Sequence, residues 1–122
     1  MQKQIIYTEN APEPIGPYSQ AVLMNGTLNA SGQIAYDTSL KGNVENETLQ
    51  VMKNLEAVLK AADMTFSQVV KCSIFLKSMD DFGTVNDVYG RYFTENPPAR
   101  ETVAVKTLPK DVNVEISLIA VK

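Results

Sequence analysis

The amino-acid sequence predicts an α+β domain in which two helices pack on one face of a β-sheet. Several short stretches alternate apolar and polar residues with the period of a strand, and two longer stretches repeat apolar residues every three or four positions. The resulting order is β-β-β-α-β-α-β-β. A chain of 122 residues is large enough for one hydrophobic core but not for two, so we expect a single domain over residues 1–122.

The first three strands are predicted in the N-terminal part of the chain, at residues 3–8, 21–24 and 27–34. The second and third flank Asn25-Gly26, a pair typical of the type I′ turn of a β-hairpin. The polar stretch 37–43 that follows is expected to be a loop.

The two helices are predicted from the spacing of their apolar residues. In residues 45–62 the apolar positions fall on one helical stripe, which consists of Leu49, Met52, Leu55, Leu59 and Ala62. A second helix begins at an N-cap formed by Ser78 or Asp80 and ends before Pro97-Pro98. Its apolar side consists of Phe82, Val85, Tyr89, Tyr92 and Phe93.

The remaining strands are predicted at residues 68–77, 100–106 and 112–121. The first of them places four apolar residues on one face: Val70, Cys72, Ile74 and Leu76. Two helices cover only one face of such a sheet, and the other face carries Phe75, Ile119 and Val121. We therefore expect the uncovered face to be buried against another copy of the chain.

The composition narrows the possible functions. A net charge of −3 argues against nucleic acid or an anionic membrane as a partner. No apolar run approaches the roughly 20 residues of a membrane span, and the N-terminus lacks a signal-peptide pattern. Because Cys72 is the only cysteine, it forms no internal disulfide, and we expect a cytoplasmic location.

The chain contains no histidine, which excludes Ser-His and Cys-His nucleophile pairs and imidazole metal sites. Acid–base chemistry must then come from carboxylates, tyrosines, lysines, the backbone or water. Cys72 is expected to pack in the core, and Asp80-Asp81 to cap a helix rather than bind a metal. Neither a metal nor an organic cofactor is expected.

Arg100 and Glu115 are the strongest candidates for a site. Arg100 follows the rigid Pro97-Pro98 turn, and Glu115 interrupts an apolar strand. Because burying an unpaired carboxylate is costly, Glu115 must face water or a polar partner, on the sheet face away from the helices. The two residues form either a surface ion pair or the two ends of a small-molecule site.

Five separated stretches of the chain together carry a family resemblance. They are Gly16-Pro17-Tyr18-Ser19-Gln20-Ala21, Ser31-Gly32-Gln33-Ile34, Asn86-Asp87-Val88-Tyr89, Pro97-Pro98-Ala99-Arg100, and Leu108-Pro109-Lys110 with Val114-Glu115-Ile116. In order and spacing the chain resembles the reactive-intermediate deaminase A family (RidA, also called YjgF) over essentially its whole length. The resemblance implies a chorismate-mutase-like fold and a homotrimer around a central barrel, with active sites between subunits.

The resemblance also implies hydrolysis of 2-iminobutanoate and 2-iminopropanoate to 2-keto acids and ammonia, without a cofactor. Arg100 would bind the substrate carboxylate through its planar fork of donors. Glu115 would position the attacking water or relay a proton to the leaving ammonia. Tyr18 would close the pocket over the substrate. The structural alternatives are an ion pair for Arg100, a rim carboxylate for Glu115 and an ordinary half-buried tyrosine for Tyr18.

Four further substrate-binding residues follow from the resemblance. Ser31 and Gly32 would present a hydroxyl and a closely approaching backbone to the imine nitrogen, although such a glycine is also typical of a β-bulge. Asn86 would line the cleft or simply be exposed on its helix. Thr102 stands where many relatives carry a cysteine, and its contact with substrate would be largely through the backbone.

Three functions remain open at this stage. The first is the imine deaminase, and the second is a trimeric protein that binds 2-keto acids or similar carboxylates without turnover. The third is an RNA-directed endoribonuclease or translation inhibitor, against which the acidic charge and the absence of histidine argue. The presence of both Arg100 and Glu115 favours the deaminase, because binding alone requires only the arginine.

Overall fold

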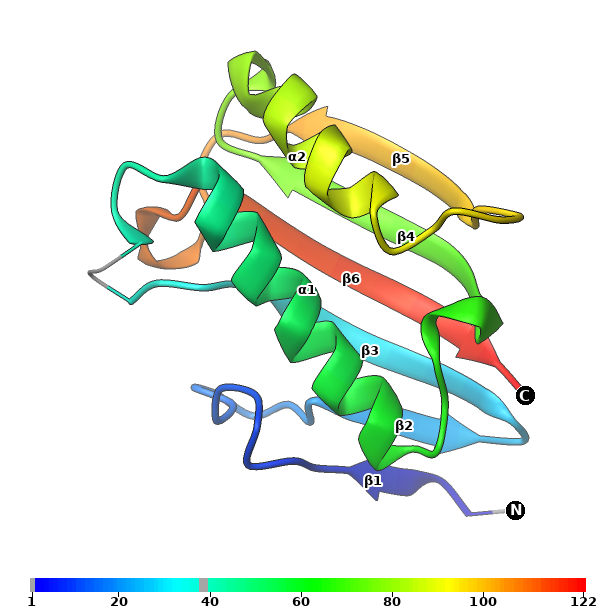
Figure 1. The fold of residues 1–122 in the computed structure, drawn as a ribbon. Helices are drawn as coiled ribbons and strands as arrows, with labels where there is room; N and C mark the ends of the chain where they lie inside the picture. Colours follow the sequence, from blue (N-terminus) through cyan, green and yellow to red (C-terminus); the bar gives the residue numbers. More distant parts are fainter. Residues whose placement is uncertain (1, 38–39) are drawn as a thin grey trace.

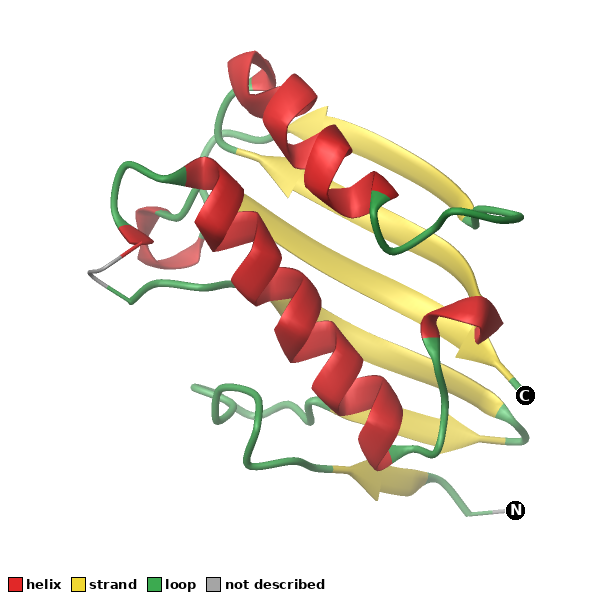
Figure 2. Cartoon of the chain, viewed as in Figure 1, coloured by secondary structure: helices red, strands yellow, loops and turns green. Residues whose placement is uncertain are grey.

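The computed structural model describes residues 2–37 and 40–122 and confirms the predicted element order (Figure 1). The six strands are β1 (Gln4–Ile6), β2 (Ala21–Met24), β3 (Thr27–Gln33), β4 (Val69–Leu76), β5 (Ala99–Ala104) and β6 (Val114–Val121). The two helices are α1 (Val44–Ala61) and α2 (Phe82–Gly90). Both helices lie on the same face of the sheet, as Figure 2 shows, so the α+β prediction is confirmed.

The strands form one mixed sheet in the order β1-β2-β3-β6-β4-β5. All neighbouring strands are antiparallel except β4 and β5, which are parallel. Parallel neighbours require a crossover connection, and here α2 provides it. As a result β5 is an edge strand beside α2, whereas β6 lies in the middle of the sheet.

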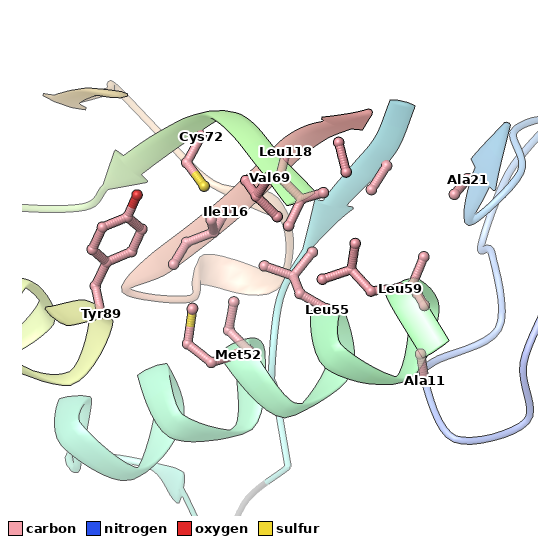
Figure 3. Close-up of a cluster of buried hydrophobic side chains, with 14 of the residues drawn as sticks. Ala11, Ala21, Met52, Leu55, Leu59, Val69, Cys72, Tyr89, Ile116 and Leu118 are labelled. Carbon is pink, nitrogen blue, oxygen red and sulfur yellow. The ribbon is translucent and has the colours of Figure 1, made fainter. Parts of the chain in front are cut away.

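The hydrophobic core lies between the sheet and the two helices, and α1 supplies most of its helical residues (Figure 3). In β6, every second residue is buried, and these residues are Val114, Ile116, Leu118 and Ala120. The predicted stripe of α1 faces them, except that Leu49 is only half-buried. Buried residues recur every two positions in β6 and about every 3.6 positions in α1, and the two sets form opposite sides of one core.

One face assignment in β4 is wrong. Val70 was expected in the core, but 49% of it is exposed, and Val69 is buried in its place. The pairing of β4 with β6 shifts between Val69 and Lys71, which is the signature of a β-bulge. An extra residue in one strand inverts the phase of the strand beyond it, so the alternation read back from Cys72 fails at this point.

The start of α2 also differs from the prediction. The hydroxyl of Ser78 accepts a hydrogen bond from the Asp80 backbone N–H at 3.1 Å, so Ser78 caps the short 3-10 helix Met79–Asp81 that leads into α2 rather than α2 itself. Asp81 occupies the N-cap position of α2, as its expected capping role requires, but its side chain makes no capping hydrogen bond. The helix ends at Gly90, and Tyr92 and Phe93 pack on Phe66 beyond it.

The predicted hairpin turn is confirmed. Asn25 and Gly26 have φ angles of 54° and 79°, and both values lie in the left-handed region that a type I′ turn requires. Within the predicted loop 37–43, residues 38–39 lie outside the described residues. No helix in the described part of the chain combines the length and apolar character needed to cross a membrane.

The sheet face away from the helices carries both apolar and polar side chains. Phe75 and Ile119 are half-buried there, and Val121 and Val103 are exposed by 43% and 44%. On the same face Lys71 and Glu101 form an ion pair at 2.9 Å, and the Ser73 hydroxyl donates to Glu101. We call this surface the open face.

Glu47, which the sequence pattern did not distinguish, fixes the start of β6 against the first turn of α1. Its carboxylate is buried, with 4% of the residue exposed. It accepts hydrogen bonds from the backbone N–H of Asn113 at 2.8 Å and of Val114 at 3.1 Å, and from the Asn113 side-chain amide at 2.8 Å. These bonds satisfy donors that the core would otherwise isolate from water.

Replacing Glu47 by alanine is expected to lower the free energy of unfolding by about 2–3 kcal/mol, because buried donors lose their acceptor. Urea unfolding followed by circular dichroism measures the loss. Glu45→Ala is the control, since Glu45 lies on the surface of the same helix turn and pairs with Arg91 at 2.8 Å. A midpoint for Glu47→Ala equal to that of the control would contradict this role.

Candidate functional site

The seven predicted site residues fall into two groups on opposite faces of the sheet. We call the first group the Glu115 half-site, and it consists of Tyr18, Ser31, Gly32 and Glu115. The second group is the Arg100 half-site, and it consists of Asn86, Arg100 and Thr102. The structure brings the members of the Glu115 half-site together around one groove on the open face.

Glu115 projects from β6 toward the open face, because its neighbours Val114 and Ile116 are fully buried on the other side. It lies opposite Phe75 of β4 in the antiparallel pairing. The groove beside it has a volume of about 360 Å³. Its wall is formed by Ile15, Tyr18, Ser31, Gly32, Ile34, Pro109 and Glu115.

A β-bulge in β3 brings Gly32 against the Glu115 carboxylate. Ala30 pairs with Leu118 and Gln33 pairs with Ile116, so Ser31 and Gly32 together lie opposite one residue of β6. A Cβ atom at Gly32 would lie 2.3 Å from Oε2 of Glu115 and 2.8 Å from its Cδ. Only glycine allows this approach, so the bulge alternative is confirmed and also fixes where Glu115 lies.

Glu115 has no cation beside it among the described residues. Its partial burial raises the pKa of the carboxyl above the ordinary value of 4.5. Desolvation has this direction because it disfavours the charged form. A carboxylate of raised pKa in a groove is suited to accept and return a proton.

Ser31 and Tyr18 line the same groove as Glu115. The Ser31 hydroxyl donates to the carbonyl of Ser19 at 2.7 Å, so toward the groove it can only accept a hydrogen bond. The Tyr18 hydroxyl accepts from the Ile15 backbone N–H at 3.3 Å and keeps its own proton available. Tyr18 is 48% exposed, as a residue at the mouth of a groove would be.

Arg100 lies on the helix-covered face of β5. It pairs with Cys72 of β4, and Cys72 is 1% exposed in the core. The Arg100 Cζ atom lies 4.9 Å from the ring centroid of Tyr89 and 5.8 Å from that of Phe82, both on α2. No carboxylate among the described residues forms an ion pair with Arg100.

The core position of Cys72 confirms the sequence prediction for this residue. Burial raises the pKa of the Cys72 thiol, so the thiol is neutral near pH 7. Burial likewise raises the pKa of the neighbouring Tyr89 hydroxyl. Sequence reasoning assigned Phe82 and Tyr89 only to the apolar side of their helix. Their spacing of seven residues was the available signal that both lie on one side of α2.

Thr102 and Asn86 flank Arg100 in different ways. Thr102 follows Arg100 on the same face of β5, and its Oγ1 atom is buried without a hydrogen-bond partner. Asn86 is exposed on α2, one helical turn from Phe82 and from Tyr89. No hydrogen bond joins Asn86 to Arg100, so Asn86 lies at the rim of this half-site.

Arg100 and Glu115 do not form an ion pair, so that alternative is wrong. The pairing places Arg100 opposite Cys72 and Glu115 opposite Phe75, two strands apart and on opposite faces. With a strand spacing of about 4.8 Å and a rise of about 3.3 Å per residue, their Cα atoms are roughly 14 Å apart. Within one chain the two side chains therefore cannot contact the same small ligand.

Comparison with known proteins identifies close relatives. A sequence model of the family described as endoribonuclease L-PSP matches residues 8–122. A RutC family protein from Pyrococcus horikoshii is 47% identical, over 98% of this chain and 98% of its own length. The 2-iminobutanoate/2-iminopropanoate deaminase of Rattus norvegicus is 46% identical, over 98% of this chain and 90% of its own length.

The fold is likewise shared with solved structures. The crystal structure of a putative endoribonuclease from Thermotoga maritima superposes with a TM-score of 0.94 at 45% identity. The match covers 100% of this chain and 98% of the other. The fold implied by the sequence resemblance is therefore confirmed.

Proposed function

Because the chain belongs to the endoribonuclease L-PSP family, which includes the YjgF/RidA proteins, we propose that it is a 2-iminobutanoate/2-iminopropanoate deaminase. One observation carries the proposal: the fold leaves two opposite charges, Arg100 and Glu115, without ionic partners among the described residues. A 2-imino acid offers a carboxylate for the first and an electrophilic carbon for water held by the second. The relative from Rattus norvegicus, which carries this enzyme's name, supports the same assignment.

We propose further that the complete site forms between subunits. Since the two half-sites lie on opposite faces of the sheet, the Arg100 half-site of one copy must meet the Glu115 half-site of another. Such a contact joins two different surfaces and closes into a ring, for which the family resemblance implies three copies. The apolar residues of the open face support this arrangement, because assembly would bury them.

The reaction needs one water and no external redox partner. Arg100 holds the substrate carboxylate through two parallel hydrogen bonds, which fixes the imine carbon relative to Glu115. Glu115 accepts a proton from water as the oxygen adds to the C=N carbon and passes this proton to the nitrogen, which gives the carbinolamine. The carbinolamine then collapses: Glu115 takes the hydroxyl proton and passes it to the amino nitrogen, the C–N bond breaks, ammonia leaves, and the oxygen becomes the keto group of the product.

The other residues of the Glu115 half-site complete this mechanism. The Ser31 oxygen can accept a hydrogen bond from the N–H of the imine, because its own proton is donated to Ser19. Tyr18, at the mouth of the groove, covers the bound substrate. Gly32 leaves the space in which the Glu115 carboxylate lies.

The decisive experiment generates 2-iminobutanoate from threonine with a dehydratase, in the presence of semicarbazide as a competing trap. We expect the protein to accelerate release of 2-oxobutanoate and so to lower the yield of the trapped imine. An unchanged yield at micromolar protein would refute the deaminase. If 2-oxobutanoate bound to the same protein without acceleration, the carboxylate-binding function would stand instead. Sedimentation tests the assembly, and a stable monomer would refute the intersubunit site.

Gly32→Ala is expected to reduce kcat by about tenfold or more with little change in the free energy of unfolding. The added Cβ would displace the Glu115 carboxylate, which is the mobile end of its side chain and can rotate away. The dehydratase-coupled assay and urea unfolding measure the two effects. Gly90→Ala is the matched control, because a Cβ at Gly90 would meet no described atom within 4 Å beyond its chain neighbours and the adjacent backbone of its own helix. Equal activity in both variants would contradict the role of Gly32.

A further inference from the structure

The guanidinium of Arg100 lies over two aromatic rings and beside no acid. Its Cζ atom is 4.9 Å from the centroid of Tyr89 and 5.8 Å from that of Phe82. None of the described carboxylates forms an ion pair with it. The orientation of this side chain is therefore set by the rings, chiefly by the nearer ring of Tyr89.

Tyr89 is itself held rigidly. It is 5% exposed, and its ring packs on that of Phe93 at 4.7 Å between centroids. Its hydroxyl lies near the Cys72 thiol and forms no hydrogen bond with a described nitrogen or oxygen. Figure 3 shows the ring standing between α2 and the strand that carries Cys72. Cys72 also pairs with Arg100, so one ring links α2 to the strands on which the site is built.

The guanidinium is planar by itself, and contact with a ring restricts how that plane can rotate. Two parallel hydrogen bonds to a carboxylate require that plane to be fixed. An aromatic ring can fix the plane of the guanidinium without neutralising its positive charge. A carboxylate in an ion pair would instead occupy the N–H donors that the substrate needs. The arrangement thus leaves Arg100 charged, oriented and free to bind.

We propose that Tyr89 is a positioning residue for Arg100 and that it acts through its ring rather than through its hydroxyl. The stacking prepares the guanidinium for the carboxylate of a 2-oxo or 2-imino acid before the ligand arrives. The identity of the substrate rests on the proposed function, whereas the contact between Tyr89 and Arg100 is independent of it. Phe82 supports the same guanidinium from a greater distance.

Two variants separate the ring from the hydroxyl. Tyr89→Phe keeps the ring, and we expect KM for 2-iminobutanoate and Kd for 2-oxobutanoate within about twofold of the parent values. Tyr89→Leu removes the ring, and we expect both constants to rise by about tenfold while kcat changes less than about threefold. We expect KM and Kd to change more than kcat because the substitution does not touch the Glu115 half-site. A tenfold effect of both variants would show that the hydroxyl acts and would overturn the proposal.

Val85→Ala controls for a loss of packing alone. Val85 is 1% exposed on the same helix, but it is not one of the residues on which Arg100 stacks. If Val85→Ala raised KM and Kd as much as Tyr89→Leu at a similar thermal midpoint, Tyr89 would be merely structural. Unchanged constants in Val85→Ala, together with raised ones in Tyr89→Leu, support positioning.

A nuclear magnetic resonance measurement decides the stacking without any ligand. The Arg100 side-chain resonances, identified by their loss in Arg100→Lys, should be shifted upfield by the Tyr89 ring current. We expect the shift in the parent and in Tyr89→Phe, and a clear decrease in Tyr89→Leu, in which only the more distant ring of Phe82 remains. An identical Arg100 spectrum in Tyr89→Leu would overturn the proposal. If the parent neither hydrolysed the imine nor bound 2-oxobutanoate, the proposed function would fail while this measurement still decided the positioning.

Discussion

Arg100→Ala is expected to lower kcat/KM for 2-iminobutanoate by about a hundredfold or more. Arg100 is the only group in its half-site that offers two parallel donors to a carboxylate, and losing such a pair costs about 2–5 kcal/mol. Because the carboxylate is bound in both the ground state and the transition state, KM should rise strongly. Part of the loss should also appear in kcat, since an unanchored imine is poorly aligned with the water. The dehydratase-coupled assay with semicarbazide measures both constants.

Two further arginine variants make this result specific. Arg91→Ala is the control, because it also removes an arginine side chain, but one on the outer surface of the protein. There Arg91 pairs with Glu45 and Asp87. The substitution should leave both constants unchanged. Arg100→Lys keeps the charge but not the planar fork, and we expect activity between those of the parent and Arg100→Ala. Parent-like activity of Arg100→Ala would refute both the carboxylate site and the deaminase assignment.

Glu115→Gln is expected to lower kcat by about 10²- to 10⁴-fold, the usual contribution of a positioned acid–base group, with a small change in KM. The amide matches the carboxylate in shape but cannot accept a proton from water. Binding of 2-oxobutanoate, measured by calorimetry, should therefore survive the substitution. A variant with the activity of the parent would show that the water is activated elsewhere.

The pH dependence follows from the raised pKa of Glu115. Activity of the parent should rise with pH through this pKa, because the ionised form is the proton acceptor. The Glu115→Gln variant should lack this limb of the profile. A dehydratase in excess at every pH keeps substrate supply from limiting the measured rate.

The raised pKa of Glu115 also predicts that this residue contributes less to the stability of the protein as pH rises. The folded chain holds the Glu115 proton to a higher pH than the unfolded chain, whose pKa is near 4.5. The contribution of this group to the free energy of unfolding therefore falls as pH rises from 4.5 through the folded-state pKa. Relative to the parent, Glu115→Gln should gain stability over that interval, and urea unfolding at several pH values measures the difference. A gain that did not depend on pH would contradict the titration.

Much of the fold could be predicted because the relevant signals are local. The period of β6 placed Val114 and Ile116 in the core and Glu115 on the opposite face, as the structure shows. The Asn25-Gly26 pair specified its turn, since few residues accept two successive left-handed conformations. The face of Val70 was beyond such reasoning, because the bulge that reverses it arises from the pairing of β4 with β6.

The sequence by itself determined the elements of this protein and the chemical types of its candidate site: one arginine after a diproline turn, one carboxylate in an apolar strand, and no histidine. Only the tertiary structure decided that these charges lie on opposite faces. Periodicity fixes which side of its own strand a residue occupies, but it does not fix which strand or helix covers that side. The crossover through α2 makes β5 an edge strand and stacks Arg100 on Tyr89, whereas Gly32 and Glu115 meet through the pairing of β3 with β6. Long-range pairing thus divided one predicted site into two halves.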